Sequence, residues 1–191
     1  MKVTAFNGSA RKDGNTAILI NIALDEIKKE GIETELIQLA GTKILGCTAC
    51  YKCKTNLDRR CAVKNDELND WIVKIEESDG IIFGSPTYFT NVTSEMSSLI
   101  NRSGLVARAN DDMFKYKAAA AVVAVRRGGA IHTYDSINHY FLANHMIVPG
   151  TNYWNIGIGK DPGDVLKDEE GILTMQNLGK NMAWLIKKLH A

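Results

Sequence analysis

A short strand-like run followed at once by small and polar residues opens the chain, and it constrains the fold more than any other segment. Val3 to Phe6 is mostly apolar with β-branched members, which is typical of a strand buried on both faces. The residues 7–10 are small or polar, and Asn15 and Thr16 stand directly before an apolar, helix-forming run. The sequence therefore predicts a strand, a tight turn and a helix N-terminus in direct succession.

A unit of this kind is suited to binding an anion. Unpaired backbone N–H groups and the positive end of the helix dipole point at whatever lies in front of the helix. Gly8 lets the backbone approach a ligand closely, Ser9 and Thr16 offer hydroxyl groups, and Arg11 adds a positive charge. We expect phosphate binding here; the alternative is an ordinary strand-to-helix loop that happens to contain an arginine.

The composition favours a globular chain and gives no reason to expect a nucleic acid or an anionic membrane as partner. Its 191 residues are 45% hydrophobic and 24% charged, with a formal net charge of +1. A chain of this length is expected to form one domain, residues 1–191. No signal-peptide pattern or long apolar run is evident, so we expect a cytoplasmic protein without structural disulfides.

Strand-like and helix-like segments alternate along the whole chain. Their order predicts an α/β fold with a five-stranded parallel sheet and helices on both faces. The expected strands are 3–6, 33–39, 80–84 (ended by Ser85-Pro86), 118–125, and a last one split between 146–148 and 153–158. The expected helices are 17–29, 66–77, 93–107, 132–144 and a C-terminal helix with an apolar stripe from Leu178 to Leu189.

Ligands bind such sheets beyond the carboxyl ends of the strands, where the strand order reverses. Two further loops at that edge carry suitable residues. The third strand is followed by Gly84-Ser-Pro-Thr-Tyr-Phe-Thr-Asn91, and the fourth by Arg126-Arg-Gly-Gly129. The aromatic side chains offer faces for a flat ring, Asn91 offers a hydrogen-bonding amide, and the arginines add positive charge. Three such loops at one edge indicate a binding site rather than three unrelated turns.

These three motifs together resemble the NAD(P)H-dependent FMN reductase branch of the flavodoxin-like superfamily, and the likeness extends over nearly the whole chain. The resemblance implies a three-layer sandwich with strand order 2-1-3-4-5, non-covalently bound FMN, and a homodimer or homotetramer. It assigns the FMN phosphate to Ser9, Arg11, Asn15 and Thr16, the ring to Pro86, Thr87, Tyr88, Phe89 and Asn91, and its pyrimidine edge to Arg127, Gly128 and Gly129. NAD(P)H would be a transient donor, since no Gly-x-Gly-x-x-Gly motif follows a strand.

In that interpretation no protein residue is catalytic, because FMN itself accepts the hydride. A positive charge near N1 and O2 of the ring would stabilise reduced FMN, a role that we assign to Arg127. We expect ping-pong kinetics, with nicotinamide and acceptor using the same place on the ring in turn.

The segment 40–64 contains all four cysteines. Cys47, Cys50 and Cys53 follow a C-x₂-C-x₂-C spacing, and Cys61 completes a four-thiolate set. Six basic residues and one acidic residue lie between Lys43 and Lys64, a balance that favours thiolates. The set resembles the compact cysteine motif of the iron–sulfur flavoproteins, which pair FMN with a [4Fe–4S] cluster. A zinc site, a dithiol formed by Cys47 and Cys50, and unliganded thiols remain alternatives.

Three functions follow from these patterns. The first is an NAD(P)H-dependent FMN reductase-type enzyme that reduces a flavin, a quinone or another small acceptor. The second is an iron–sulfur flavoprotein that exchanges electrons with a ferredoxin-like partner, and the four cysteines are its sequence feature. The third is a module that binds flavin without turnover.

Overall fold

The five strands form one parallel sheet. The structure, a computed structural model, describes all residues 1–191. The sheet consists of β1 (Lys2–Asn7), β2 (Glu33–Gln38), β3 (Gly80–Pro86), β4 (Ala118–Val125) and β5 (Ile156–Ile158). Their order is β2-β1-β3-β4-β5, and every neighbouring pair is parallel. This confirms the predicted α/β fold and the 2-1-3-4-5 strand order.

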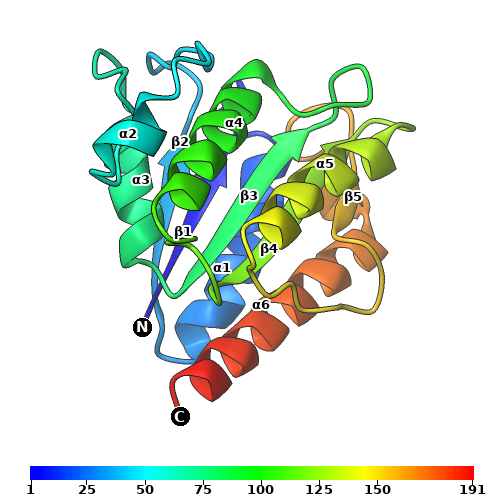
Figure 1. The fold of residues 1–191 in the computed structure, drawn as a ribbon. Helices are drawn as coiled ribbons and strands as arrows, with labels where there is room; N and C mark the ends of the chain where they lie inside the picture. The colour runs from blue at the N-terminus through cyan, green and yellow to red at the C-terminus, as the bar shows by residue number, and fades with distance from the viewer.

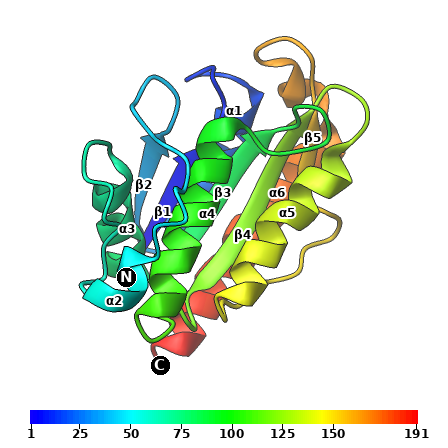
Figure 2. The ribbon, with the colours of Figure 1, turned by 45° about the horizontal axis from the view of Figure 1, so that its top comes forward.

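Helices cover both faces of the sheet (Figures 1 and 2). One face packs against α3 (Leu68–Glu77), α4 (Ser94–Ala109) and α5 (Ala130–Ala143), and the other against α1 (Asn15–Lys29) and α6 (Glu169–Leu189). Two short helices, α2 (Lys52–Asn56) and η1 (Asp164–Lys167), lie in the connections. No helix combines the length and the apolar character that crossing a membrane requires.

Alternation along the strands divides the core into two apolar clusters. In β4 every residue is buried; Ala119, Ala121 and Val123 contribute to the cluster under α3, α4 and α5, while Ala120 and Val122 face α1 and α6. A strand covered by helices on both faces must be apolar throughout, which explains the run of small apolar residues.

The strand β3 continues two residues further than the sequence predicts. Proline was expected to end the strand, but Pro86 pairs with Ala124 of β4, and the Thr87 N–H donates to the Ala124 carbonyl at 3.0 Å. Pairing of β3 with β1 already ends at Gly84. Because N–H groups alternate in direction along a strand, the missing N–H of Pro86 falls on the side where β1 has ended.

The last strand is shorter than the sequence predicts. Of the two expected segments, only Ile156–Ile158 forms β5, while Ile147 makes an isolated bridge to Ala118 at the other end of β4. Pro149 and Gly150 lead into a loop in which the Thr151 hydroxyl donates to Asn155 Oδ1 at 2.9 Å. The chain therefore leaves the sheet edge between the two segments and returns to it.

Candidate functional site

A pocket of about 230 Å³ lies at the carboxyl edge of the sheet. The loop between β1 and α1, the ends of β3 and β4, and the loop after β5 form its walls. The lining residues are Ser9, Arg11, Asn15, Thr16, Pro86, Thr87, Tyr88, Ala124, Val125, Arg126, Gly159 and Lys160. The structure thus brings the first predicted loop together with the starts of the second and the third, as expected where the strand order reverses.

The loop between β1 and α1 is fixed in place by the backbone of Gly8. Its N–H donates to the Gly84 carbonyl at 2.8 Å, and its carbonyl accepts from the Thr93 hydroxyl at 2.8 Å. A Cβ atom here would lie 3.0 Å from both Gly84 O and Thr93 Oγ1. Only glycine therefore fits without displacing β3 or the start of α4, and the next residue, Ser9, is held at the pocket wall.

The helix α1 begins at the pocket with its first backbone N–H groups unpaired. Its N-cap residue is Gly14, and no side chain caps the helix. The first backbone bond of the helix is from Ile18 N to Gly14 O, so the N–H groups of residues 15–17 have no protein acceptor. Together with the helix dipole, these donors favour an anion at this end of the pocket.

The remaining polar groups of the pocket are suited to a phosphorylated ligand with a polar ring. Arg11, Arg126 and Lys160 line it, and no carboxylate does. The hydroxyl oxygen of Thr87 is buried and has no hydrogen-bond partner in the protein. An unpaired buried hydroxyl costs about 1–3 kcal/mol, and Thr87 is a lining residue of this pocket.

The side chain of Asn15 binds a neighbouring loop, and its predicted contact with the phosphate stays a prediction. Its side-chain amide donates to the Asp161 carbonyl at 3.0 Å, and its oxygen accepts from the N–H of Gly163 at 2.9 Å. Both polar ends of the side chain thus hold the loop after β5, and only the backbone N–H of Asn15 is free toward the pocket.

Several predicted site residues lie outside this pocket. Phe89 and Thr90 occupy the tip of a tight reversal closed by hydrogen bonds between Tyr88 and Asn91, and both have positive φ angles of 49° and 62°. Phe89 is fully exposed, and the Asn91 side chain accepts from the N–H of Val92. As contacts of a flavin ring, Phe89 and Asn91 stay predictions.

Arg127, Gly128 and Gly129 line a neighbouring groove of about 300 Å³. This groove lies between the β4–α5 loop and the region of β5, and it includes the exposed rings of Tyr153 and Trp154. The chain turns sharply at Gly129, where φ is +88°, and α5 begins at once. The arginine that lines the first pocket is Arg126, so the assignment of Arg127 to the flavin edge also stays a prediction.

Sequence reasoning missed Gly159 and Lys160. Both follow β5 directly, at the same edge as the other loops. The rule that loops after parallel strands carry the site could have found them, but the position of the last strand was too uncertain in the sequence to apply it.

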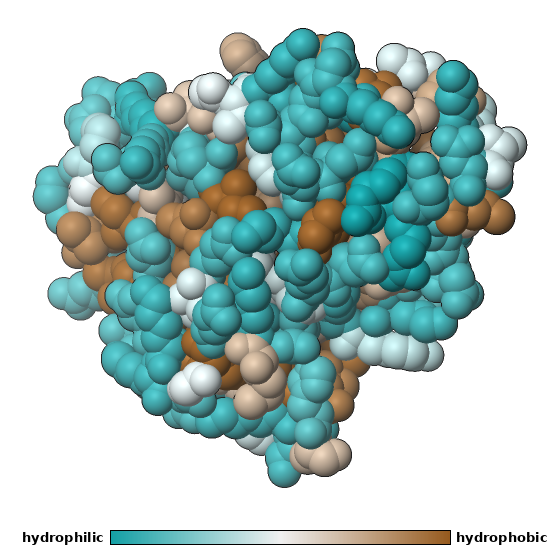
Figure 3. All heavy atoms as spheres, turned by 90° about the vertical axis from the view of Figure 1, so that its left-hand side faces the viewer, coloured by the Kyte–Doolittle hydropathy of each residue, from teal (hydrophilic) through white to brown (hydrophobic).

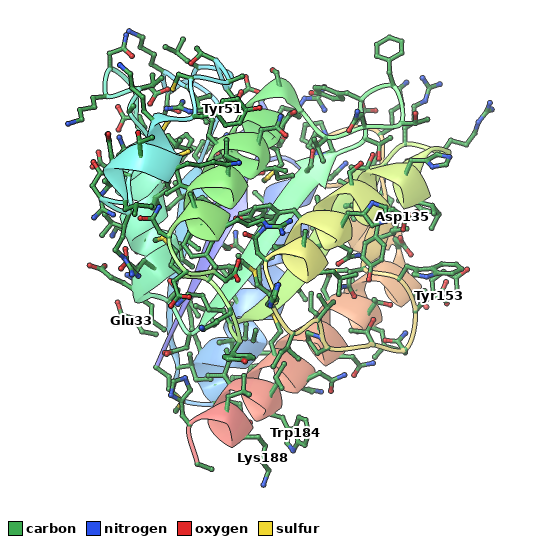
Figure 4. The ribbon with its side chains drawn as sticks, viewed as in Figure 1. Glu33, Tyr51, Asp135, Tyr153, Trp184 and Lys188 are labelled. Carbon is green, nitrogen blue, oxygen red and sulfur yellow. The ribbon has the colours of Figure 1, made fainter.

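All four cysteines line a second, much smaller cavity of about 20 Å³, next to α4. Cys53 is buried in α2, Cys61 is half-buried, and Cys47 and Cys50 are exposed. No group of three or more His, Cys, Asp or Glu side chains is arranged to hold a metal ion. This cavity, which Tyr51 lines, lies on a different side of the molecule from the groove lined by Tyr153 and Trp154, as the labelled tyrosines show in Figure 4.

The backbone of the cysteine segment is unusual. Ala49, Tyr51, Leu57 and Arg59 all have positive φ angles between 52° and 61°. This left-handed conformation costs a non-glycine residue about 1–2 kcal/mol, so contacts with the rest of the protein must hold the segment in shape.

The face with α2 and α3 shows apolar patches between hydrophilic side chains (Figure 3).

Two residues outside the segment hold Cys61. The side chain of Asn69 accepts from the Cys61 N–H at 2.8 Å and donates to its carbonyl at 3.0 Å. Nη2 of Arg102, on α4, donates to the Cys61 sulfur at 3.4 Å. The backbone and the sulfur of this cysteine are therefore both fixed.

Arg102 also forms a buried ion pair with Asp66, whose side chain is 0% exposed against 1% for the arginine. Burial alone would raise the pKa of Asp66, but the hydrogen bonds from Arg102 and from the N–H of Leu45 outweigh it and lower that pKa. Burial likewise opposes the charge of Arg102, but bonds to Asp66 and Cys61 keep its pKa raised. Both groups are ionised at neutral pH.

The thiols of the segment differ in acidity. The N–H of Lys52, the hydroxyl of Thr48 and the charge of Lys52 lower the pKa of Cys50. Burial raises the pKa of Cys53. An exposed thiol and a buried thiol with opposite shifts thus line one cavity.

Comparison with known proteins adds to this geometry. The sequence profile of the family described as NADPH-dependent FMN reductase matches residues 1–161. The chain is 40% identical to an iron–sulfur flavoprotein of Methanocaldococcus jannaschii over 98% of both chains. It is 32% identical to an iron–sulfur flavoprotein of Methanosarcina thermophila, over 95% of this chain and 93% of that one.

Among solved structures, RosB with bound 8-demethyl-8-formylriboflavin-5'-phosphate matches with a TM-score of 0.76 and 21% identity, over 100% of this chain and 80% of that one. A flavodoxin from the domain Archaea matches with a TM-score of 0.63 and 16% identity, over 98% and 99%. At these identities the likeness shows the shared fold.

Proposed function

The chain belongs to the NADPH-dependent FMN reductase family, and from this premise we propose that it holds FMN in the pocket at the carboxyl edge of the sheet and transfers electrons from NAD(P)H to a small acceptor. The family, and relatives named iron–sulfur flavoproteins, identify the chain as a flavoprotein of the oxidoreductase class. The electron donor, the acceptor and the residues that hold FMN are the proposal.

One observation carries the assignment of the pocket. Unpaired N–H groups at the start of α1, three cationic side chains and the unpartnered hydroxyl of Thr87 all lie at one pocket that contains no carboxylate. A phosphate matches the first two features, and a ring with polar edges matches the third.

Different residues of the pocket bind the phosphate and the ring. The N-terminus of α1, with Ser9, Arg11 and Thr16, binds the phosphate, and Lys160 adds charge from the loop that Asn15 holds. Pro86 and Tyr88 pack beside the ring, and Thr87 donates a hydrogen bond to it. Arg126 supplies the positive charge near the ring that the sequence assigned to Arg127. When bound, FMN supplies the hydride and single-electron chemistry.

A second function is favoured by the cysteine cavity. We propose that Cys47, Cys50, Cys53 and Cys61 hold a [4Fe–4S] cluster, so that the protein exchanges electrons with a ferredoxin-like partner. Four thiols at one cavity, the basic surroundings and the names of the relatives support this proposal. Because the cavity is only about 20 Å³, the exposed side chains of Cys47 and Cys50 must move outward to admit the cluster.

The test is an absorption spectrum of protein purified without oxygen, with FMN, iron and acid-labile sulfide quantified. We expect one FMN per chain and, for the second function, about four iron and four sulfide per chain. Rapid bleaching of the flavin by NADPH or NADH supports the reductase. Slow bleaching by these donors but fast bleaching by reduced ferredoxin supports the electron carrier.

Two results would contradict the proposals separately. A protein that stays colourless after soaking in excess FMN contradicts the FMN site. A protein that contains FMN but neither iron nor sulfide, even after anaerobic reconstitution, contradicts the cluster and leaves the reductase. Intersecting initial-rate lines with varied NADPH and acceptor would contradict ping-pong use of the pocket.

A further inference from the structure

Arg102 is a buried cation whose hydrogen bonds converge on the cysteine segment. It lies in the middle of α4 with its side chain 1% exposed. Nη1 donates to Leu45 O at 2.9 Å and to Asp66, and Nη2 donates to Val63 O at 3.3 Å and to Asp66 Oδ1 at 3.2 Å. These acceptors lie on both sides of the four cysteines in the sequence, so one side chain joins the two ends of the segment.

The arginine reaches one further acceptor, the Cys61 sulfur, at 3.4 Å from Nη2. Arg102 is also a lining residue of the cavity that all four cysteines share. Its planar group presents several donors in a fixed arrangement, which a lysine could not reproduce. The sulfur of Cys61 is therefore held at a defined position next to a permanent positive charge.

Stability alone is a weak explanation for this arrangement. Replacing a buried ion pair by apolar residues is often neutral or stabilising, because removing both charges from water is costly. The Nε atom of Arg102 has no partner although it is buried, which adds to the cost. An arrangement that is costly and that ends on a cysteine sulfur is better explained by a role at that sulfur.

We propose that Arg102 is a positioning residue for the cluster proposed on the four cysteines, and that its hydrogen bond to the Cys61 sulfur raises the reduction potential of that cluster. This inference rests on the proposed cluster function. Hydrogen bonds and positive charge at a ligand sulfur stabilise the reduced form of such a group, because one-electron reduction adds one negative charge. Asp66 neutralises the charge of Arg102 and fixes the orientation of its guanidinium group, since it accepts hydrogen bonds from both Nη atoms.

The experiment compares variants of full-length holoprotein. Arg102→Lys keeps the charge but loses the planar donors, and Arg102→Gln loses the charge as well. Arg108→Lys is the matched control, because Arg108 lies on the same helix but is exposed and outside the cysteine cavity. Bound FMN reports that each variant is folded, since its pocket is elsewhere. Dithionite titration at constant pH, followed by low-temperature EPR, gives the potential of the cluster apart from that of the flavin.

We expect the potential to fall from the wild type to Arg102→Lys and further to Arg102→Gln, with Arg108→Lys equal to the wild type. Loss of iron from Arg102→Lys with FMN fully retained also supports the positioning role. Should Arg102→Gln fail to fold, Arg102→Lys still decides. Equal potentials and equal iron contents in Arg102→Lys and the control overturn this inference alone. Absence of iron and sulfide from the wild type overturns the cluster function and this inference with it.

Discussion

The buried hydroxyl of Thr87 illustrates how a single atom can distinguish a binding site from a surface hollow. The preceding residue continues β3, and the Thr87 N–H is bonded to β4, so the backbone of Thr87 is held at the edge of the pocket. Its oxygen is buried and unpaired. The FMN-free protein therefore carries a cost of about 1–3 kcal/mol. We expect a rotation of the Thr87 side chain to let a bound ring pair with this oxygen.

Replacing this hydroxyl by a methyl group should separate stability from binding. We expect Thr87→Val to leave the free energy of unfolding of the FMN-free protein unchanged or higher, because no hydrogen bond is lost. The same variant should raise the Kd for FMN about fivefold, the value of one neutral hydrogen bond. Urea unfolding and fluorescence titration with FMN measure the two effects.

The control is Thr90→Val, since the Thr90 hydroxyl is exposed and bonds to the neighbouring Phe89 carbonyl. It should change neither quantity. A Thr87→Val protein that binds FMN as tightly as the wild type would contradict the role of this hydroxyl.

At the residue scale, position along the chain predicted the pocket only in part. Ser9, Arg11, Thr16 and Thr87 could be placed because each follows a buried strand or starts a helix at one sheet edge. Phe89 could not, because its exposure depends on a reversal with two successive positive φ angles at residues that rarely adopt them. The hydrogen bond from Arg102 to the Cys61 sulfur joins residues 41 positions apart, so no local sequence pattern predicts it.

At the scale of elements, the contact between α1 and α6 depends on one position without a side chain. A Cβ atom at Gly179 of α6 would lie 2.3 Å from the backbone oxygen of Ala23 in α1. Backbone atoms of a packed helix cannot move aside as a flexible side chain would. The two helices can therefore approach this closely only with glycine here.

Gly179→Ala should destabilise the protein although alanine favours a helix by about 1 kcal/mol over glycine. We expect a net loss of about 1–3 kcal/mol in the free energy of unfolding, because the helices must separate. Urea unfolding followed by circular dichroism measures it. Gly150→Ala, at a position with open space around it, is the control and should change stability by less than about 0.5 kcal/mol. Equal stability of the two variants would contradict the close contact.

The elements themselves were well predicted, because their patterns are strong. The apolar run of β4 and the alternation of strands and helices were sufficient for the fold class, and the resemblance supplied the strand order. The boundaries that differ, at Pro86 and at β5, depend on which neighbouring strand is present at that point. The sequence of one strand does not reveal where the strand beside it in the sheet ends.

At the scale of the whole molecule, charge is distributed unevenly although the total is small. The formal net charge is +1, yet Arg11, Arg126 and Lys160 line one pocket without a carboxylate. Attraction for an anionic ligand should therefore be local, and it should weaken as salt screens these exposed side chains over about 10 Å at 0.1 M.

We expect the Kd for FMN to rise about fivefold between 0.05 M and 0.5 M salt, by screening of the phosphate. Riboflavin, which lacks the phosphate, should bind more weakly and respond little to salt. Lys160→Gln should reduce the salt response, whereas Lys188→Gln, on α6 near the C-terminus, should not (Figure 4). Fluorescence titrations provide all of these values, and identical salt responses for the two ligands would contradict a phosphate subsite.

The amide of Asn15 has a consequence for the architecture as a whole. It joins the first turn of α1 to the backbone of Asp161 and Gly163, about 150 positions later in the chain, and α6 begins a few residues beyond. The N-terminus of α1 at the pocket and the loop that leads into α6 are therefore held together by one side chain. A truncation that removed α6 should therefore loosen the loop that Asn15 holds and weaken phosphate binding. It would do so although no side chain of α6 lines the pocket.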